Sequence, residues 1–409
     1  MGPLTGVRVI DLTRALSGPY ATLLLAGLGA QVIKIEDPNG GDVARGNIPY
    51  AGRDGIAAVP RHPDDLSVPF LDRCRGKFGI TLNLKHPGAI AVFDDLVRDA
   101  DIVVENYSAG TADRLGVGYQ HASSVNPRIV YTSISGLGAD RLGQDAKAYD
   151  LITQALSGLT MTSGAASDGP VRFGLPMGDL AAPLFAVMGT LAAFVRARET
   201  GQGQHVDVSM LGSLTSLAAV EPWQAYDAVG MPSRTGNYLN RLAPFGIFEA
   251  ADGQVAICAA NDKFFARLPD ALDQPELLTD PRYAKRAQRA SNADGIHAIV
   301  AAWSRDKTIA EITKRLSAAG IPVAQVRTPQ QAVTDPQVIA RGETVPLTHP
   351  VYGQVDGLYG SGAPWTFSDT RAGFDRPAPL LGQHNADVYE QVLGYSPDRL
   401  AAMADDGLI

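Results

Sequence analysis

A single aspartate stands where a glycine-rich segment meets a long apolar run. Residues 174–179 read GLPMGD and lead into an apolar stretch that begins at Leu180, so Asp179 lies at or near the N-terminus of a predicted helix. Asp179 could cap this helix by accepting backbone N–H groups. Alternatively, the helix dipole could keep the carboxylate ionised, and Gly178 could leave room for a substrate. An ionised carboxylate can attack a thioester or another acyl group and form an anhydride.

Motifs of other common active sites are absent from the sequence. The turn after the first predicted strand, residues 13–19, has one glycine, so the dinucleotide fingerprint is missing, and no P-loop motif occurs. There is no Gly-x-Ser-x-Gly elbow. The 7 histidines form no close ligand set, and the 2 cysteines, Cys74 and Cys258, form neither a CxxC pair nor a disulfide framework. These absences disfavour an NAD enzyme, and we expect no metal site.

The elements that would position Asp179 alternate between strands and helices. A strand, a helix and a strand within about 30 residues of the start form a βαβ unit, which requires a parallel sheet. Residues 36–70 are rich in Gly, Pro and Asp without a period, and are predicted as a long surface loop. The fold class is therefore α/β, with a Rossmann-like doubly wound large domain. The predicted strands cover 7–12, 31–36, 101–104, 128–133 and 204–208, and the predicted helices cover 18–28, 87–98, 149–160, 178–198 and 210–228.

The pattern changes at about residue 230. Two short strands around Asp252-Gly253 precede mostly helical, charged sequence, and 321–326 is a further predicted strand. We interpret this stretch as a smaller α+β domain. The predicted division is 1–228 for the first part of the large domain, 229–330 for the small domain, and 331–409 for a return segment with C-terminal helices.

Composition limits the class of protein. The chain has 409 residues, of which 45% are hydrophobic and 19% charged, as in a globular protein long enough for two domains. Its formal net charge of -8 disfavours nucleic-acid binding, which needs clustered cations. The most apolar run, 180–195, is about 16 residues long, short for a bilayer span. We expect no signal peptide, no membrane association and a reducing, cytoplasmic location.

Short motifs that together are specific occur along nearly the whole chain, although each alone is weak. They are residues 6–12, 18–19, 28–36, 82–85, 104–107, 113–116, 147–150, 178–179, 200–210 and 378–384. In this ordered set the sequence resembles the class III CoA-transferases, which include formyl-CoA transferase, carnitine CoA-transferase and, as a divergent branch, α-methylacyl-CoA racemase.

The resemblance implies a nucleophile and a set of binding residues. Asp179 matches the family's catalytic aspartate, and coenzyme A would be a substrate rather than a permanently bound cofactor. Lys85 and Arg114 could meet the CoA phosphates, or could be solvated surface charges. Leu16 and Tyr149 would contact the acyl group, as would Lys147. The CoA cleft would be formed by Ala15, Leu82, Lys85, Asn106, Tyr107, Arg114, Leu115, Lys147 and Met210.

Departures from the family pattern bear on the substrate. Leu16 stands where formyl-CoA transferase has a glutamine, Asp37 replaces a family arginine, and no run of glycines occurs in 230–260. A formyl/oxalyl pair is therefore not supported, and Leu16 favours a larger or less polar acyl group. The expected substrates are an acyl-CoA and a small carboxylic acid.

Two alternatives to a transferase stay open. A racemase of this superfamily needs a histidine beside the aspartate, and residues 143–149 contain none, although Asp145 could act as a substitute base. A non-catalytic acyl-CoA-binding protein would not depend on Asp179. The family also forms interlocked homodimers, so the resemblance implies a second copy of the chain as partner.

Overall fold

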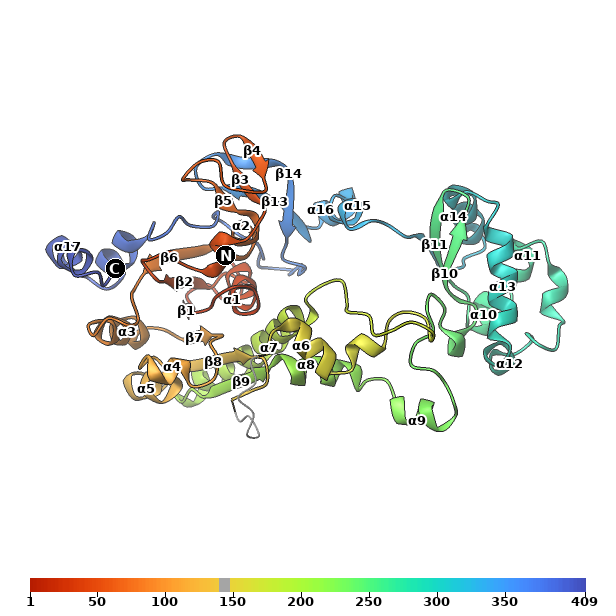
Figure 1. Cartoon of the computed structure of the whole chain (residues 1–409), viewed down its shortest axis with the longest axis horizontal. Coiled ribbons are helices and arrows are strands. Elements are labelled where there is room, and N and C mark those ends of the chain that lie inside the picture. The colour runs from red at the N-terminus through yellow and green to blue at the C-terminus, as the bar shows by residue number, and fades with distance from the viewer. Residues whose placement is uncertain (140–147) are drawn as a thin grey trace. The chain divides into compact units, whose positions relative to one another are not determined.

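The computed structural model describes residues 1–139 and 148–409, which form two compact units (Figure 1). Unit 1 comprises Met1–Ser157, Gly174–Ala218 and Val333–Ile409, and unit 2 comprises Gly158–Phe173 and Ala219–Ala332. The small domain predicted from the sequence, residues 229–330, lies within unit 2. It lacks residues 158–173, which also belong to unit 2.

The described part of unit 1 is built on a parallel sheet of six strands (Figure 1). Its order is β6-β2-β1-β7-β8-β9, and every neighbouring pair is parallel. This confirms the mixed α/β fold with a parallel sheet. The sequence analysis missed the edge strand β6. The strands are β1 (Arg8–Asp11), β2 (Gln31–Glu36), β6 (Lys77–Thr81), β7 (Ile102–Glu105), β8 (Val130–Ser135) and β9 (His205–Ser209).

Helices cover both faces of this sheet. Side chains alternate between the faces along each strand, so Val9 and Ile10 point to opposite sides. Val9 belongs to the core under α1 (Ser17–Gly27) and α7 (Met177–Thr200). Ile10 belongs to the core under α3 (Ala89–Arg98), α5 (Tyr119–Val125) and α17 (Pro397–Asp405). Two apolar cores thus fix the sheet between layers of helices.

The strand order reverses between β1 and β7. From β1 the chain moves outward through β2 to β6, and it then returns to build β7, β8 and β9 on the other side. In open parallel sheets, ligands bind at the carboxyl ends of the strands beside such a switch point. The segments that follow β1 and β7 therefore mark the expected site.

Residues 36–70 are not the continuous loop that was predicted. They contain a 3-10 turn at Val43–Gly46 and a small antiparallel sheet, β4-β3-β5. The strands are too short to show a period in the sequence, and their pairing with one another defines them. The elements are β3 (Tyr50–Gly52), β4 (Gly55–Ala57) and β5 (Leu66–Ser67), followed directly by α2 (Val68–Cys74).

The remaining elements of unit 1 lie outside the main sheet, in the segments that follow its strands and in the C-terminal part. The expected hairpin in the C-terminal segment is β13 and β14, which pair antiparallel with an irregularity between Pro346 and Thr348. The elements are α4 (Thr111–Arg114), α6 (Asp150–Leu156), α8 (Met210–Ala218), α16 (Pro336–Ala340), β13 (Thr344–His349), β14 (Gly353–Ser361) and the π-helix Asp387–Val392.

Unit 2 is a smaller α+β body around its own core. Its described strands form one antiparallel sheet, β10-β11-β12. The predicted helix 210–228 is interrupted at Pro222, which lacks the N–H that a continuous helix needs, so α9 is separate from α8. The elements are α9 (Trp223–Ala228), β10 (Phe245–Ala250), β11 (Gly253–Cys258), α10 (Asp262–Phe265), α11 (Leu268–Ala271), α12 (Arg286–Ser291), α13 (Ala293–Ser304), α14 (Ile309–Ala318), β12 (Val323–Gln325), α15 (Pro329–Val333), which reaches the start of the next unit-1 segment, and 3-10 turns at Leu159–Met161, Asn240–Leu242 and Pro275–Leu278.

The helix α7 is longer than the apolar run 180–195 suggested. With 24 residues it is long and apolar enough to span a membrane by length and composition, and half of its most apolar window is buried inside the structure. Core helices of soluble proteins meet the same criterion, so this is weak evidence for a membrane.

Candidate active site

Asp179 is the third residue of α7 and does not cap it. The N-cap position is held by Pro176, which makes no side-chain cap bond. The capping carboxylate is instead Asp150, at the start of α6, whose Oδ1 accepts the Gly178 N–H at 2.7 Å. The capping interpretation of Asp179 is therefore wrong, because a carboxylate from another helix accepts the N–H group in the first turn of α7.

Gly178 serves helix packing. A Cβ at this position would lie 2.6 Å from Thr153 Oγ1 and 3.2 Å from Asp150 Oδ1. Distances this short require the neighbouring side chains to shift. The expectation that Gly178 leaves room for a substrate is thus corrected, since α6 occupies the space beside it.

The Asp179 carboxylate is half-buried and has few partners. Among the described residues it accepts no hydrogen bond and forms no ion pair. Burial and, to a smaller extent, the nearby Asp150 carboxylate raise its pKa to about 6, although the Arg73 guanidinium lowers it. A carboxylate removed from water and left without donors keeps its lone pairs available to attack an electrophile.

The segment after β1 is held in place on both sides of the switch point. Ala15 adopts a left-handed φ of 67°, its N–H donates to Asp42 Oδ1 at 2.8 Å, and its carbonyl accepts from Arg73 at 3.1 Å. Asn106, after β7, clamps the neighbouring Arg14: Oδ1 accepts the Arg14 N–H at 2.7 Å and Nδ2 donates to its carbonyl at 2.8 Å. The structure therefore brings the predicted residues Ala15 and Asn106 together.

Buried ion pairs lie next to this segment. Lys34 Nζ is 2.8 Å from Asp42 Oδ2 and donates to the Thr13 carbonyl at 2.8 Å, and Lys77 Nζ is 3.0 Å from Asp11 Oδ2. Burial alone would raise the pKa of Asp42, but the Lys34 ammonium and backbone N–H donors outweigh it and lower the pKa to about 2. These buried ion pairs fix the conformation of the predicted CoA-binding segment.

The other predicted residues follow the strands that end at the same edge of the sheet. Lys85 and Arg114 are exposed, and Arg114 donates to Thr111 Oγ1 at 2.7 Å. The structure does not join these two cations to the Ala15 segment. Leu82 and Met210 are buried, Leu16, Tyr107 and Leu115 are half-buried, Tyr149 is exposed at the start of α6, and Lys147 lies outside the described residues.

Three functional candidates were missed from the sequence: Arg73, Asp42 and Asp150. Asp150 follows Tyr149 in one of the quoted motifs, so its position was visible although its capping role was not. Arg73 and Asp42 lie in the region interpreted as loop or left unassigned, and only the folded chain places them beside Ala15.

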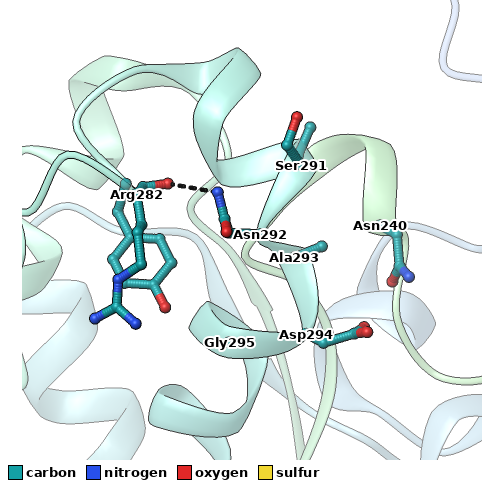
Figure 2. A pocket seen from close by; sticks show the side chains of 9 residues that line it. Asn240, Arg282, Ser291, Asn292, Ala293, Asp294 and Gly295 are labelled. Carbon is teal, nitrogen blue, oxygen red and sulfur yellow. Dashed lines mark hydrogen bonds between the residues drawn. The ribbon is translucent and has the colours of Figure 1, made fainter.

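Two cavities of unit 2 are lined by none of the predicted residues. In unit 2, a polar cavity of about 420 Å³ lies beside α12 and the start of α13, where Asn292 Nδ2 donates to the Arg282 carbonyl at 3.4 Å (Figure 2). A second cavity in unit 2, of about 360 Å³, contains Trp223 and an Arg241–Glu221 ion pair of 2.8 Å. In the described ranges, no group of His, Cys, Asp and Glu side chains could hold a metal ion.

The two histidines considered for a racemase have partners other than Asp179. His121 Nε2 lies 2.6 Å from Asp94, and His205 Nε2 lies 2.9 Å from Ser133 Oγ. Asp145 lies outside the described residues. The racemase alternative therefore gains no support from the described geometry.

Comparison with known proteins gives a consistent result. The family model described as CoA-transferase family III matches residues 4–385. The chain is 38% identical over 343 residues to an acetyl-CoA:oxalate CoA-transferase of Acetobacter aceti, covering 83% of this chain and 85% of that protein. It is 34% identical over 406 residues to a succinyl-CoA–D-citramalate CoA-transferase of Chloroflexus aurantiacus, covering 98% and 96%.

Solved structures agree with this assignment. The crystal structure of a CAIB/BAIF family protein from Brucella suis superposes with a TM-score of 0.80 at 28% identity, covering 96% of this chain and 99% of that one. The relatives named here are CoA-transferases, which disfavours the racemase alternative. As its ordered motifs predict, the chain belongs to CoA-transferase family III.

Proposed function

We propose that this enzyme moves CoA from an acyl-CoA donor to a free carboxylic acid through covalent intermediates on Asp179. The observation that carries the proposal is the state of this carboxylate: half-buried, at the start of a long helix, and without a hydrogen bond or ion pair to any described residue. The names of the relatives give the same reaction class.

The reaction proceeds as four acyl transfers. An Asp179 oxygen attacks the thioester carbonyl, the C–S bond breaks, and CoA leaves as a thiolate with an aspartyl–acyl anhydride in place. The thiolate attacks the aspartyl carbonyl of the anhydride, which releases the donor acid and forms an aspartyl–CoA thioester. The acceptor carboxylate attacks this thioester to give a second anhydride and the thiolate. Attack of the thiolate on the acceptor's acyl carbonyl yields the new acyl-CoA and regenerates Asp179.

Retention of the released thiolate is the main requirement of this scheme. A well-oriented intramolecular partner can contribute about 7–11 kcal/mol to catalysis. The exposed cations Lys85 and Arg114 are available for the CoA phosphates, and the Ala15 segment is held rigidly by Asp42, Arg73 and Asn106. A fixed segment and free cations are what a tethered CoA would need.

We include small dicarboxylic acids among the acceptors. Relatives are named for oxalate, D-citramalate, glutarate and mesaconate, each of which carries two carboxylates. Leu16 argues against a formyl/oxalyl pair, whereas the Acetobacter relative is named for oxalate, so oxalate belongs in any substrate panel.

The test is a panel of acyl-CoAs and free acids incubated with the protein, with new thioesters detected by mass spectrometry. Asp179→Asn should lower turnover by at least about 1,000-fold. CoA binding, measured by calorimetry, should stay within a few-fold of wild type. A CoA-sized adduct on the tryptic peptide with Asp179 would support the thioester intermediate. The exposed Asp99 at the end of α3 provides the matched control, Asp99→Asn.

Two outcomes would contradict the proposal. Unchanged turnover in Asp179→Asn would remove the covalent scheme. Exchange of the α-hydrogen in deuterated water, without exchange of acyl groups between CoA and acids, would establish a racemase instead.

The interlocked homodimer and a cytoplasmic location belong to the same proposal. The helices α6, α7 and α8 of unit 1 leave large apolar side chains exposed, and a second copy of the chain would remove them from water. Light scattering in solution should give twice the chain mass of 43.1 kDa, and a monomer would refute the dimer. The exposed side chains are Leu151, Ile152, Leu156, Leu184, Met188, Val195 and Leu217.

A further inference from the structure

Arg73, on α2, is a half-buried cation with no anionic partner in the described part of the chain. Its guanidinium donates one hydrogen bond, from NH1 to the Ala15 carbonyl at 3.1 Å, and forms no ion pair with a described residue. The neighbouring arginines differ: Arg45 pairs with Glu36 at 2.8 Å, and Arg75 pairs with Asp72 at 3.1 Å. The remaining N–H donors of Arg73 are thus available to a ligand.

The residues that follow Ala15, whose carbonyl binds the Arg73 guanidinium, contain further hydrogen-bond donors without acceptors among the described residues. Leu16 follows Ala15 as the N-cap of α1 and makes no side-chain cap bond. The N–H groups of Ser17 and Gly18 have no acceptor among the described residues, and the Ser17 hydroxyl, in a residue only 1% exposed, has no partner. A buried donor left unpaired costs about 1–3 kcal/mol. Unpaired donors beside a cation are what an anionic oxygen would satisfy.

Arg73 also lies on the side of the reacting carboxylate. It is the cation, among the described residues, whose charge opposes the effects of burial and of Asp150 on Asp179. The two side chains nevertheless form no ion pair. Arg73 therefore acts electrostatically on Asp179, and it contacts the peptide between Ala15 and Leu16, the predicted acyl-contact residue.

We propose that Arg73 binds the distal carboxylate of a dicarboxylic acyl group whose other end reacts at Asp179. This inference rests on the proposed transferase function and names the residue that sets its substrate class. A guanidinium presents paired donors that match a carboxylate, and such charge-assisted bonds are stronger than neutral ones. A monocarboxylic acyl chain of the same length leaves these donors unpaired and binds less well.

The experiment compares acids of equal chain length. Succinate against butyrate, and glutarate against valerate, are assayed as acceptors with wild type, Arg73→Gln and Arg73→Lys. Wild type should prefer the dicarboxylates. Arg73→Gln should lower kcat/KM for dicarboxylates by about 10- to 100-fold and for monocarboxylates by less than about threefold. Arg73→Lys should lie between. Arg98→Gln, an exposed arginine at the end of α3, controls for the loss of one charge.

Three outcomes would overturn the inference. Equal losses for both classes of acid would mean that Arg73 only supports the Ala15 segment. A uniform rise in KM for every CoA thioester would make it a phosphate ligand. A wild-type enzyme without preference would remove the specificity itself.

A binding measurement separates this inference from the proposed function. Calorimetry of succinate with the CoA-saturated protein should show binding to wild type and a loss of at least about tenfold in Arg73→Gln. Succinate binding that depends on Arg73, without transfer to any acid, would refute the transferase proposal and leave the carboxylate site. Transfer without such dependence would refute the site and leave the transferase.

Discussion

The carboxylates of Asp42 and Asp179 are both withdrawn from water, yet their surroundings differ in every partner. Asp42 faces the Lys34 ammonium and accepts backbone N–H groups from Ala15 and Ala44. Asp179 faces another carboxylate, Asp150, and accepts no hydrogen bond from a described residue. The pKa of Asp42 falls to about 2, and that of Asp179 rises to about 6. Burial is common to both, so the partners decide the sign, and the paired carboxylate is structural while the unpaired one is available for chemistry.

The largest loss of stability should come from breaking the buried Lys34–Asp42 ion pair. Asp42→Asn leaves the Lys34 ammonium buried without its counter-charge, and removal of one member of a buried pair costs about 3–5 kcal/mol. The free energy of unfolding from guanidinium titration, at fixed protein concentration, measures this loss. The exposed control Asp99→Asn should change it by less than about 0.5 kcal/mol. A loss below about 1 kcal/mol at Asp42 would contradict the comparison.

Asp179→Asn should change the free energy of unfolding in the opposite direction, because the Asp179 carboxylate has no cationic partner like Lys34 among the described residues. The folded-state pKa of Asp179 is raised from 3.8 to about 6, so the folded protein binds the proton more tightly than the unfolded chain. Its contribution to stability is therefore lost as pH rises from about 4 to 6, a penalty of about 1–3 kcal/mol above that window. At pH 8, Asp179→Asn should unfold at a higher guanidinium concentration than wild type. At pH 4, the two proteins should unfold at the same concentration. Destabilisation at pH 8 would show that the carboxylate has partners after all.

Activity should titrate with the same carboxylate. Attack requires ionised Asp179, so kcat/KM should rise through pH 6 and level off above pH 7. Asp150→Asn keeps an oxygen for the Gly178 N–H but removes a like charge, and should lower the apparent pKa by less than about one unit. Arg73→Gln should raise it. A flat profile between pH 5 and 8 in wild type would mean that another step limits the rate.

The strands of the main sheet illustrate what the sequence could reveal. The strand 31–36 was predicted to the residue, because Val32, Ile33 and Ile35 give it an apolar, β-branched character despite Lys34. The strand at 77–81 was missed: it opens with a lysine and contains a glycine, whereas buried parallel strands normally read as apolar runs. Lys77 is buried there because it pairs with Asp11, 66 residues earlier in the chain. Pairing over such a distance has no local signature.

The site was predictable to a similar extent. Glycine and proline before an apolar run correctly placed Asp179 in the first turn of a helix. Whether its carboxylate was a cap or a free group depended on Asp150, 28 residues upstream of Gly178, which accepts the Gly178 N–H. Likewise, nothing local to Arg73 connects it with Ala15, 58 residues away. Short motifs thus identify the candidate reacting residues, whereas their hydrogen-bond and charge partners depend on contacts between distant segments.

The smallest predicted change in stability tests how firmly Asp42 and Arg73 hold the Ala15 segment. A left-handed conformation costs a residue with a Cβ about 1–2 kcal/mol, whereas glycine adopts it freely but loses about 0.5–1 kcal/mol through its more flexible unfolded state. With φ at 67°, Ala15→Gly should therefore raise the free energy of unfolding by no more than about 1.5 kcal/mol.

The backbone bonds of residue 15 to Asp42 and Arg73 do not involve its methyl group, so they should survive in Ala15→Gly. If the methyl contacts CoA, the loss of about 0.8 kcal/mol should weaken CoA binding about fourfold, measurable by calorimetry. Asp42→Asn should weaken it more, because it releases the segment itself. Equal affinities in both variants would mean that the ion pairs stabilise the fold without positioning the cofactor-binding segment.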